Sequence, residues 1–197
     1  MARGLRSSKA GYGWLAIGLH WTMAPLVIGL FVLGWWMVNL DYYDPWYTRA
    51  PSLHQSIGLV GILILGLRFL QRVTSPKPAS HPGHRAWERV LAHLVHWLLY
   101  ALLLAVSVSG YLITTADGRP ILFFEWLEIP ATVTSLPNQE DVAGETHEYL
   151  AYVVVALIAL HVAGGVKHQF IDRDGTLYRM LGLEAKASTD PGEDGVK

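Results

Sequence analysis

The chain has 197 residues and a formal net charge of −1, with 52% hydrophobic and only 16% charged residues. Soluble domains carry about 25% charged residues, so this composition favours a membrane protein, and we expect no nucleic-acid partner. Cysteine is absent, which excludes disulfides, cysteine-bound iron–sulfur clusters and covalent haem attachment through C-x-x-C-H.

Four apolar stretches lie at about residues 14–38, 52–70, 91–114 and 147–167. Each has about 17 to 25 residues, the length that crosses about 30 Å of hydrocarbon as a helix. Helices are required because backbone groups in lipid must hydrogen-bond within the chain. We therefore predict an all-α membrane protein with one domain, a bundle of four transmembrane helices over residues 1–182. A polar, disordered tail is expected at 183–197, and the first stretch is expected to be retained rather than cleaved as a signal peptide.

Basic residues are distributed unevenly between the two sides of the predicted bundle. All of the 15 Lys and Arg residues except Arg49 and Arg119 lie before the first stretch, around the second connection or after the fourth stretch. Loops that keep such an excess of positive charge stay on the cytoplasmic side of a membrane. The pattern therefore predicts that both termini are cytoplasmic.

The connection at 115–146 is the longest on the opposite side. It contains "GRPILFFEWLEIP", an aromatic segment for which we expect a short interfacial helix. Its charges are strongly acidic, with Arg119 as the single basic residue against Asp117, Glu125, Glu128, Glu140, Asp141 and Glu145. Such a surface repels small anions and attracts a basic partner.

Histidines occur at two depths of the predicted bundle. His147 and His161 are separated by about 21 Å along the fourth helix and face nearly the same way. His20 in the first helix is level with His161, and His54 at the start of the second is level with His147. The sequence therefore predicts two pairs of histidines across helices, one in each leaflet.

Paired neutral imidazoles inside a bundle suit the axial positions of a haem iron. Interhelical hydrogen bonding is the alternative, but four ionisable rings at matched depths in a membrane favour a functional role. A zinc-protease motif is excluded, because "HEYLA" has Ala151 where H-E-x-x-H requires histidine. Small residues near the pairs would leave space for a flat macrocycle, or would simply let helices approach closely: Gly58, Gly61, Ala151, Gly164 and Gly165.

The order of motifs carries a resemblance to a known family. "IGLHW", "LHQSIG", "LAHLVHW", "THEYLA", "ALHVAG" and "KHQF", with "GRPILFF" in the long connection, resemble the bacterial cytochrome b561 family over nearly all of residues 10–182. The resemblance implies a four-helix protein of the bacterial inner membrane with two non-covalent haems b that exchanges electrons with quinone. It also implies that His20 and His161 ligate the inner haem iron and that His54 and His147 ligate the outer one.

Other polar residues near the cytoplasmic side have several interpretations. For His93 and His96 we favour quinone binding or proton transfer beside the inner haem, while ligation of that haem or a simple interfacial position are alternatives. Arg68 and Arg72 either pair with haem propionates or anchor the helix in the interface. His168 has the same status as His93, whereas "SHPGHR" at 80–85 predicts that His81 and His84 are solvated loop residues.

These features together predict transfer of electrons across the membrane. The expected partners are lipid, a ubiquinone-type quinone and a periplasmic donor, for which superoxide is one candidate, as in a branch of the family that oxidises it. The alternative is a non-catalytic cytochrome b subunit that serves a soluble dehydrogenase, a hydrogenase or a c-type cytochrome. A histidine-lined metal transporter is a third, more remote hypothesis.

Overall fold

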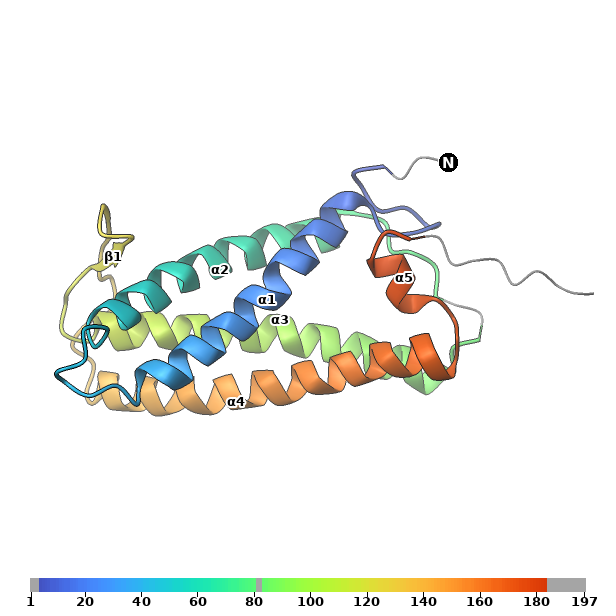
Figure 1. Ribbon diagram of the computed structural model, residues 1–197. Coiled ribbons are helices and arrows are strands. Elements are labelled where there is room, and N and C mark those ends of the chain that lie inside the picture. Colours follow the sequence, from blue (N-terminus) through green and yellow to red (C-terminus); the bar gives the residue numbers. More distant parts are fainter. Residues whose placement is uncertain (1–3, 81–82, 184–197) are drawn as a thin grey trace, which may run out of the picture.

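The computed structural model describes residues 4–80 and 83–183 and forms an antiparallel bundle of four long helices (Figure 1). The helices are α1 (Trp14–Met37), α2 (Arg49–Thr74), α3 (Ala86–Thr115) and α4 (Gln139–Val166). The predicted all-α, four-helix architecture is confirmed. Residues 184–197 of the predicted tail, and His81, lie outside the described residues.

The bundle has two different ends. The "hairpin end" is formed by Met37, Arg49, Thr115 and Gln139 and carries a small antiparallel hairpin of β1 (Ile121–Phe123) and β2 (Leu127–Ile129). The "termini end" is formed by Trp14, Thr74, Ala86 and Ile171. At that end α4 continues into a π-helical turn, η1 (Lys167–Ile171), closed by the bond from the Asp172 amide to the Lys167 carbonyl at 3.1 Å. The short α5 (Thr176–Met180) follows.

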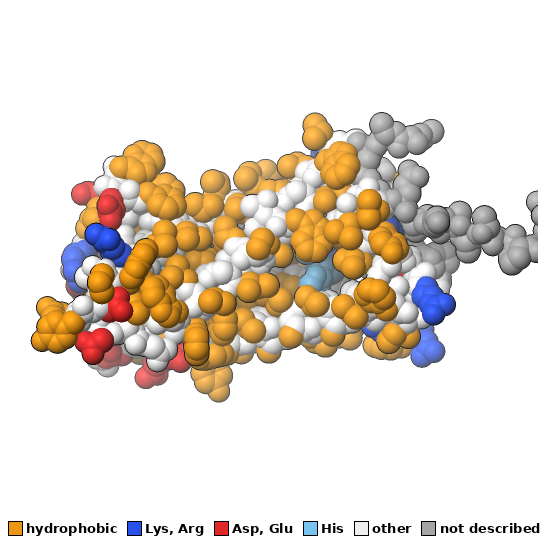
Figure 2. Space-filling view, viewed as in Figure 1, with side chains coloured by type: hydrophobic (Ala, Val, Ile, Leu, Met, Phe, Trp, Pro, Cys, Tyr) orange, Lys and Arg blue, Asp and Glu red, His pale blue; other side chains and the backbone are white. Residues whose placement is uncertain are grey.

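Lipid contact explains why so few side chains are buried. All four long helices are sufficiently long and apolar to cross a membrane, yet only 6 to 11% of the residues in their most apolar windows are buried within the protein. Figure 2 shows apolar side chains along the length of the bundle and charged ones gathered at its ends. Within the bundle, α1 packs mainly on α2 and α3 mainly on α4.

Two helices begin earlier than the apolar stretches indicated, α3 at Ala86 and α4 at Gln139. Hydropathy marks only the part of a helix that lies in hydrocarbon, and the backbone stays helical further out where polar contacts stabilise it. The Glu88 carboxylate accepts the amide of Arg85 at 2.8 Å, while the Gln139 side chain donates to the carbonyls of Leu112 and Val133 at 2.9 and 3.1 Å. The first contact belongs to a capping box at the start of α3, and the others attach the start of α4 to α3 and to the segment after the hairpin.

The predicted interfacial helix at 118–130 is wrong, because this segment forms the β1–β2 hairpin. Phe124 and Glu125 both have positive φ, 45° and 65°, and the Trp126 amide donates to the Phe123 carbonyl at 3.2 Å. This is the geometry of a tight hairpin turn. Pro120 and Pro130 restrict the segment at both sides, which leaves too few residues for a stable helix.

Ser56 of α2 fixes the hairpin to the bundle. Its side chain is nearly fully buried, at 1% exposure. The hydroxyl oxygen accepts the amide of Phe124 at 2.9 Å and the hydroxyl donates to the Ser52 carbonyl at 2.9 Å. A hydroxyl about two turns inside α2 therefore attaches the hairpin to the bundle.

Replacing Ser56 with alanine is expected to loosen the hairpin. The Phe124 amide would lose its buried acceptor, at a cost of about 1 to 3 kcal/mol. Hydrogen–deuterium exchange should show faster exchange at residues 121–129 in S56A. S107A is the matched control, because Ser107 bonds the Leu103 carbonyl of its own helix at 2.8 Å. Equal exchange in S56A and S107A would contradict this role of Ser56.

Candidate functional site

Four histidines form two pairs inside the bundle. At the hairpin end His54 of α2 faces His147 of α4, with ring centroids 6.1 Å apart and an interplanar angle of 73°. Nearer the termini end His20 of α1 faces His161 of α4, with centroids 6.2 Å apart and an angle of 63°. The structure thus brings together the residues whose depths matched in the sequence.

The spacing within each pair can be compared with metal coordination. Two imidazoles that bind one metal ion from opposite sides, at about 2.0 Å from each coordinating nitrogen, place their ring centroids about 6 Å apart. The distances of 6.1 and 6.2 Å fit this arrangement. Direct stacking or a direct hydrogen bond between the rings would bring them closer.

Hydrogen bonds select the tautomer of His147. Its Nδ1 lies 2.8 Å from the Val106 carbonyl, which can only accept, so Nδ1 carries the proton. The Ser109 hydroxyl lies 3.2 Å from the same nitrogen and donates to the Val106 carbonyl. This leaves Nε2 of His147 with its lone pair available to a metal ion, the arrangement usual for a ligating histidine.

Its partner His54 has a buried Nδ1 with no hydrogen-bond partner among the described residues. A buried polar atom without a partner is uncommon in a native structure and requires an explanation. A group bound beside the His54 ring would provide one. The donor set here, two imidazoles and no thiolate, fits the axial positions of a haem b.

Space for a ligand exists beside this pair. A cavity of about 550 Å³, lined mainly by apolar side chains, includes both His54 and His147, and this volume is within the range of small-molecule and cofactor sites. A Cβ added at Gly34 would lie 3.2 Å from His54 Cε1, and one at Gly110 would lie 3.1 Å from His147 Cε1. These two glycines therefore keep the space around the rings open.

Sequence reasoning missed Gly34 and Gly110. Each could have been identified as a glycine in an apolar stretch that lies at the depth of a histidine on another helix. Among the glycines that were considered, Gly58 has open space at its Cβ position, as do Gly164 and Gly165. Gly61 differs, since its Cβ would meet Leu26 of α1 at 3.2 Å, and it serves close helix approach.

A third histidine approaches the pair nearer the termini end. The His96 ring of α3 lies 5.1 Å from that of His161, closer than two ligands on opposite sides of one ion. Its Nδ1 donates to the Ala92 carbonyl at 2.6 Å. His93, three residues away, is exposed. The structure therefore separates the two histidines of α3 and places only His96 beside a pair.

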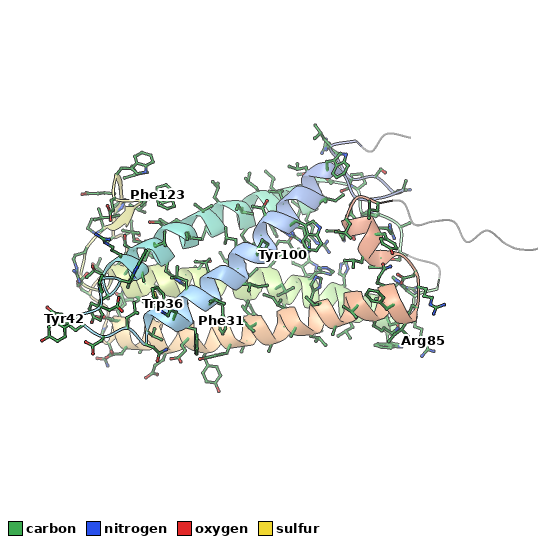
Figure 3. All side chains as sticks on the ribbon, viewed as in Figure 1. Phe31, Trp36, Tyr42, Arg85, Tyr100 and Phe123 are labelled. Atoms are coloured by element: carbon green, nitrogen blue, oxygen red, sulfur yellow. The ribbon has the colours of Figure 1, made fainter. Side chains whose placement is uncertain are left out.

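Arginines and aromatic rings lie near these histidines on α2 and α3. Arg68 donates from Nε to the Tyr100 hydroxyl at 3.3 Å, while Arg72 Nε is buried without a hydrogen-bond partner among the described residues. Phe69 lies 6.2 Å from the Trp97 ring and 5.9 Å from the Tyr100 ring. Figure 3 shows Tyr100 pointing into the bundle from α3.

His84 is not a solvated loop residue, and this prediction is wrong. Its side chain is only 17% exposed, and its Nε2 lies 2.6 Å from Oδ2 of Asp174. His168 lies beside it, with ring centroids 4.3 Å apart. No sequence pattern indicated this contact, because His84 and Asp174 are 90 residues apart.

A family model and individual relatives place the chain in the same family. The family described as prokaryotic cytochrome b561 matches residues 11–183. Cytochrome b561 homolog 2 of Escherichia coli K12 is 48% identical over 181 residues, 92% of this chain and 95% of that protein. A probable superoxide oxidase CybB of Yersinia pestis is 28% identical over 175 residues, 86% of this chain and 95% of that protein.

Proposed function

Since this chain belongs to the prokaryotic cytochrome b561 family, we propose that it holds two haems b and exchanges electrons between a donor at the hairpin end and quinone in the membrane. Family membership and the four apolar helices make it a multi-pass protein of the bacterial inner membrane that binds b-type haem and transfers electrons. The number of haems, their ligands and the redox partners are our proposals.

The two histidine pairs carry the proposal. His54 and His147 hold one haem, and His20 and His161 hold the other. The centroid spacings of 6.1 and 6.2 Å support these pairs, and the 5.1 Å between His96 and His161 disfavours His96 as a ligand. The bound iron supplies one-electron chemistry, while the chain sets its position and surroundings.

The termini end is assigned to the cytoplasm. Of the 15 basic residues only Arg49 and Arg119 belong to the hairpin end, and the positive-inside rule places the basic end inside. The pair formed by His54 and His147 then lies nearer the periplasm. The pair formed by His20 and His161 lies nearer the cytoplasm.

Quinone is assigned to the termini end, beside His96. The rings of Phe69, Trp97 and Tyr100 offer an apolar border to a flat ligand. The buried Nε of Arg72 needs an acceptor, which a quinone oxygen or a haem propionate supplies. His96 keeps Nε2 available for a proton, because its Nδ1 bonds Ala92. Quinone reduction consumes protons, which would come from the cytoplasmic side.

The charge of the hairpin end favours some electron donors over others. Arg119 is engaged by Asp117 in an ion pair, which leaves Arg49 as the one other basic residue there. The carboxylates at this end are Asp41, Asp44, Asp117, Glu125, Glu128, Glu140, Asp141, Glu145 and Glu148. This surface steers cations inward and repels anions. We therefore favour a basic protein donor such as a c-type cytochrome, and superoxide is the second candidate because of the name of the Yersinia relative.

Histidine variants test the two haem sites. His54→Ala or His147→Ala should lower the haem content from two to about one per chain, or convert one haem to high spin, because loss of one axial ligand is a local change. His20→Ala and His161→Ala should do the same to the other haem. Haem-to-protein ratios and electron paramagnetic resonance spectra measure the result.

His96→Ala is the matched control, and it should retain two low-spin haems. If His96→Ala removed a low-spin signal while His20→Ala left both signals intact, the proposed pairing would be incorrect. Absence of haem from folded protein prepared with a haem supply would exclude the proposal as a whole.

Variants that retain both haems test the position of the quinone. His96→Ala and Arg72→Ala should slow haem reoxidation by a soluble ubiquinone analogue about tenfold or more, since each removes a group that handles protons or holds an anion. Arg49→Ala at the hairpin end is the control and should react at the normal rate. Slow reoxidation in Arg49→Ala alone would indicate that the quinone site lies at the hairpin end instead.

Stopped-flow reduction of the haems distinguishes the donors. With a basic c-type cytochrome the rate should fall as ionic strength rises, because salt screens attraction to the acidic end. With superoxide the rate should be slow at low salt and rise, whereas an uncharged quinol should show no salt dependence. Haem reduction by superoxide at about 10⁸ M⁻¹s⁻¹ at low salt would contradict electrostatic exclusion of the anion.

A further inference from the structure

A cluster of metal-ligating groups lies at the termini end, outside the two histidine pairs. His84, His168 and Asp174 each offer one ligand atom, and these three atoms all lie within 4.8 Å of one another. The Asp174 oxygen is 2.6 Å from the His84 nitrogen and 3.0 Å from the His168 nitrogen. The side chains are 17%, 15% and 2% exposed. The cluster is therefore compact and largely screened from solvent.

The His168 nitrogen distinguishes this cluster from a simple set of hydrogen bonds. It lies 2.9 Å from Asp172 Oδ2 and 3.0 Å from Asp174 Oδ2. It nevertheless forms no hydrogen bond with suitable geometry to any residue that the structure describes, although it is buried. A buried nitrogen with two carboxylate oxygens beside it, but with neither along its bonding direction, needs another partner. A cation held among these atoms would meet that need.

We propose that His84, His168 and Asp174 bind a divalent transition metal ion, of which Zn²⁺ is the best match. Two imidazole nitrogens and one carboxylate oxygen are ligands that Zn²⁺ accepts at about 2.0 to 2.2 Å, with the fourth position open to water or another carboxylate. Ca²⁺ and Mg²⁺ prefer sites made of oxygen atoms and fit less well.

Tetrahedral coordination requires only small movements. Ligand atoms around Zn²⁺ lie about 3.3 Å apart when the bonds are about 2.0 Å long. The distances from Asp174 Oδ2 to His84 Nε2 and His168 Nδ1 are 2.6 and 3.0 Å, and they need to widen by about 0.7 and about 0.3 Å. Asp172 Oδ2 lies 2.9 Å from His168 Nδ1 but is paired with Lys167 Nζ at 2.7 Å, so the fourth position is left to water.

Hydrogen bonds around the cluster orient the Asp174 carboxylate and keep it ionised. Asp174 Oδ1 accepts the amide of Thr176 at 2.8 Å, which leaves Oδ2 for the two imidazoles. Burial alone raises the pKa of Asp174, but the hydrogen bonds from Thr176 and His84 lower it to about 2. The carboxylate is therefore ionised at neutral pH. Such outer contacts are typical supports of a metal ligand.

An entry path for the ion exists. His84 and Asp174 line a surface cavity of about 460 Å³. Its other charged walls are Arg85, Glu88, Lys167 and Asp172, so that with Asp174 it holds three carboxylates against two basic groups. The excess negative charge favours a cation.

A bound ion would join two segments that are distant in sequence. His84 belongs to the connection between α2 and α3, whereas His168 and Asp174 follow α4. Because the unfolded chain does not present these ligands together, Zn²⁺ would stabilise the folded termini end. The ion would be structural, separate from both histidine pairs.

The test uses the full-length holoprotein without a histidine tag, purified in detergent after treatment with a chelator and then dialysed against Zn²⁺. We expect about one zinc per chain by elemental analysis. The zinc absorption-edge spectrum should show only nitrogen and oxygen neighbours at about 2.0 to 2.1 Å, and added Zn²⁺ should raise the melting temperature.

Ligand variants decide whether the cluster is the site. His84→Ala, His168→Ala and Asp174→Asn should each weaken zinc binding about tenfold or more. His93→Ala is the matched control at the same end and should bind zinc normally. Haem content and spectrum verify folding in each variant, and Asp174→Asn preserves the size of the side chain. No stoichiometric zinc in the folded protein, or undiminished binding in all three variants, would overturn the proposal.

Discussion

Helix α4 contributes one histidine to each pair, and the rest of the bundle depends on this constraint. His147 and His161 lie on one rigid helix about 21 Å apart. Two other helices must therefore present an imidazole to α4 at two fixed depths. α2 does so at the hairpin end with His54, and α1, which runs obliquely across the bundle in Figure 1, does so nearer the termini end with His20.

Hydropathy and helical periodicity account for what could be predicted. Both are properties of single helices, and an apolar stretch in lipid must be helical because its backbone groups can hydrogen-bond only within the chain. The bundle and the matched depths of His20 with His161 and of His54 with His147 followed from them. The hairpin did not, because its turn and its attachment to Ser56 are decided by contacts between distant segments. Gly34, Gly110 and the His84–Asp174 contact were missed for the same reason.

The two ends of the bundle differ in chemistry as well as in fold. The hairpin end has a β-hairpin and an excess of carboxylates, whereas the termini end holds many basic side chains and, among the described residues, the ion pairs that join distant segments. Lys167 illustrates this, since it reaches Glu88 of α3 at 2.5 Å and Asp172 at 2.7 Å. The two ends thus differ in the sign of their charge and in the number of contacts between distant segments.

The π-helical turn after α4 rotates the residues that follow it about the helix axis. A turn closed by a bond from residue i+5 to residue i contains one residue more than an α-helical turn, and one residue corresponds to about 100° of rotation. Everything beyond Lys167 is consequently turned by that angle relative to a straight continuation of α4. Deleting a single residue within 167–171 would swing α5 around the helix axis and separate the Met180 carbonyl from the Trp21 indole, now 2.8 Å apart. The number of residues in this turn is therefore constrained by the contact between α5 and α1.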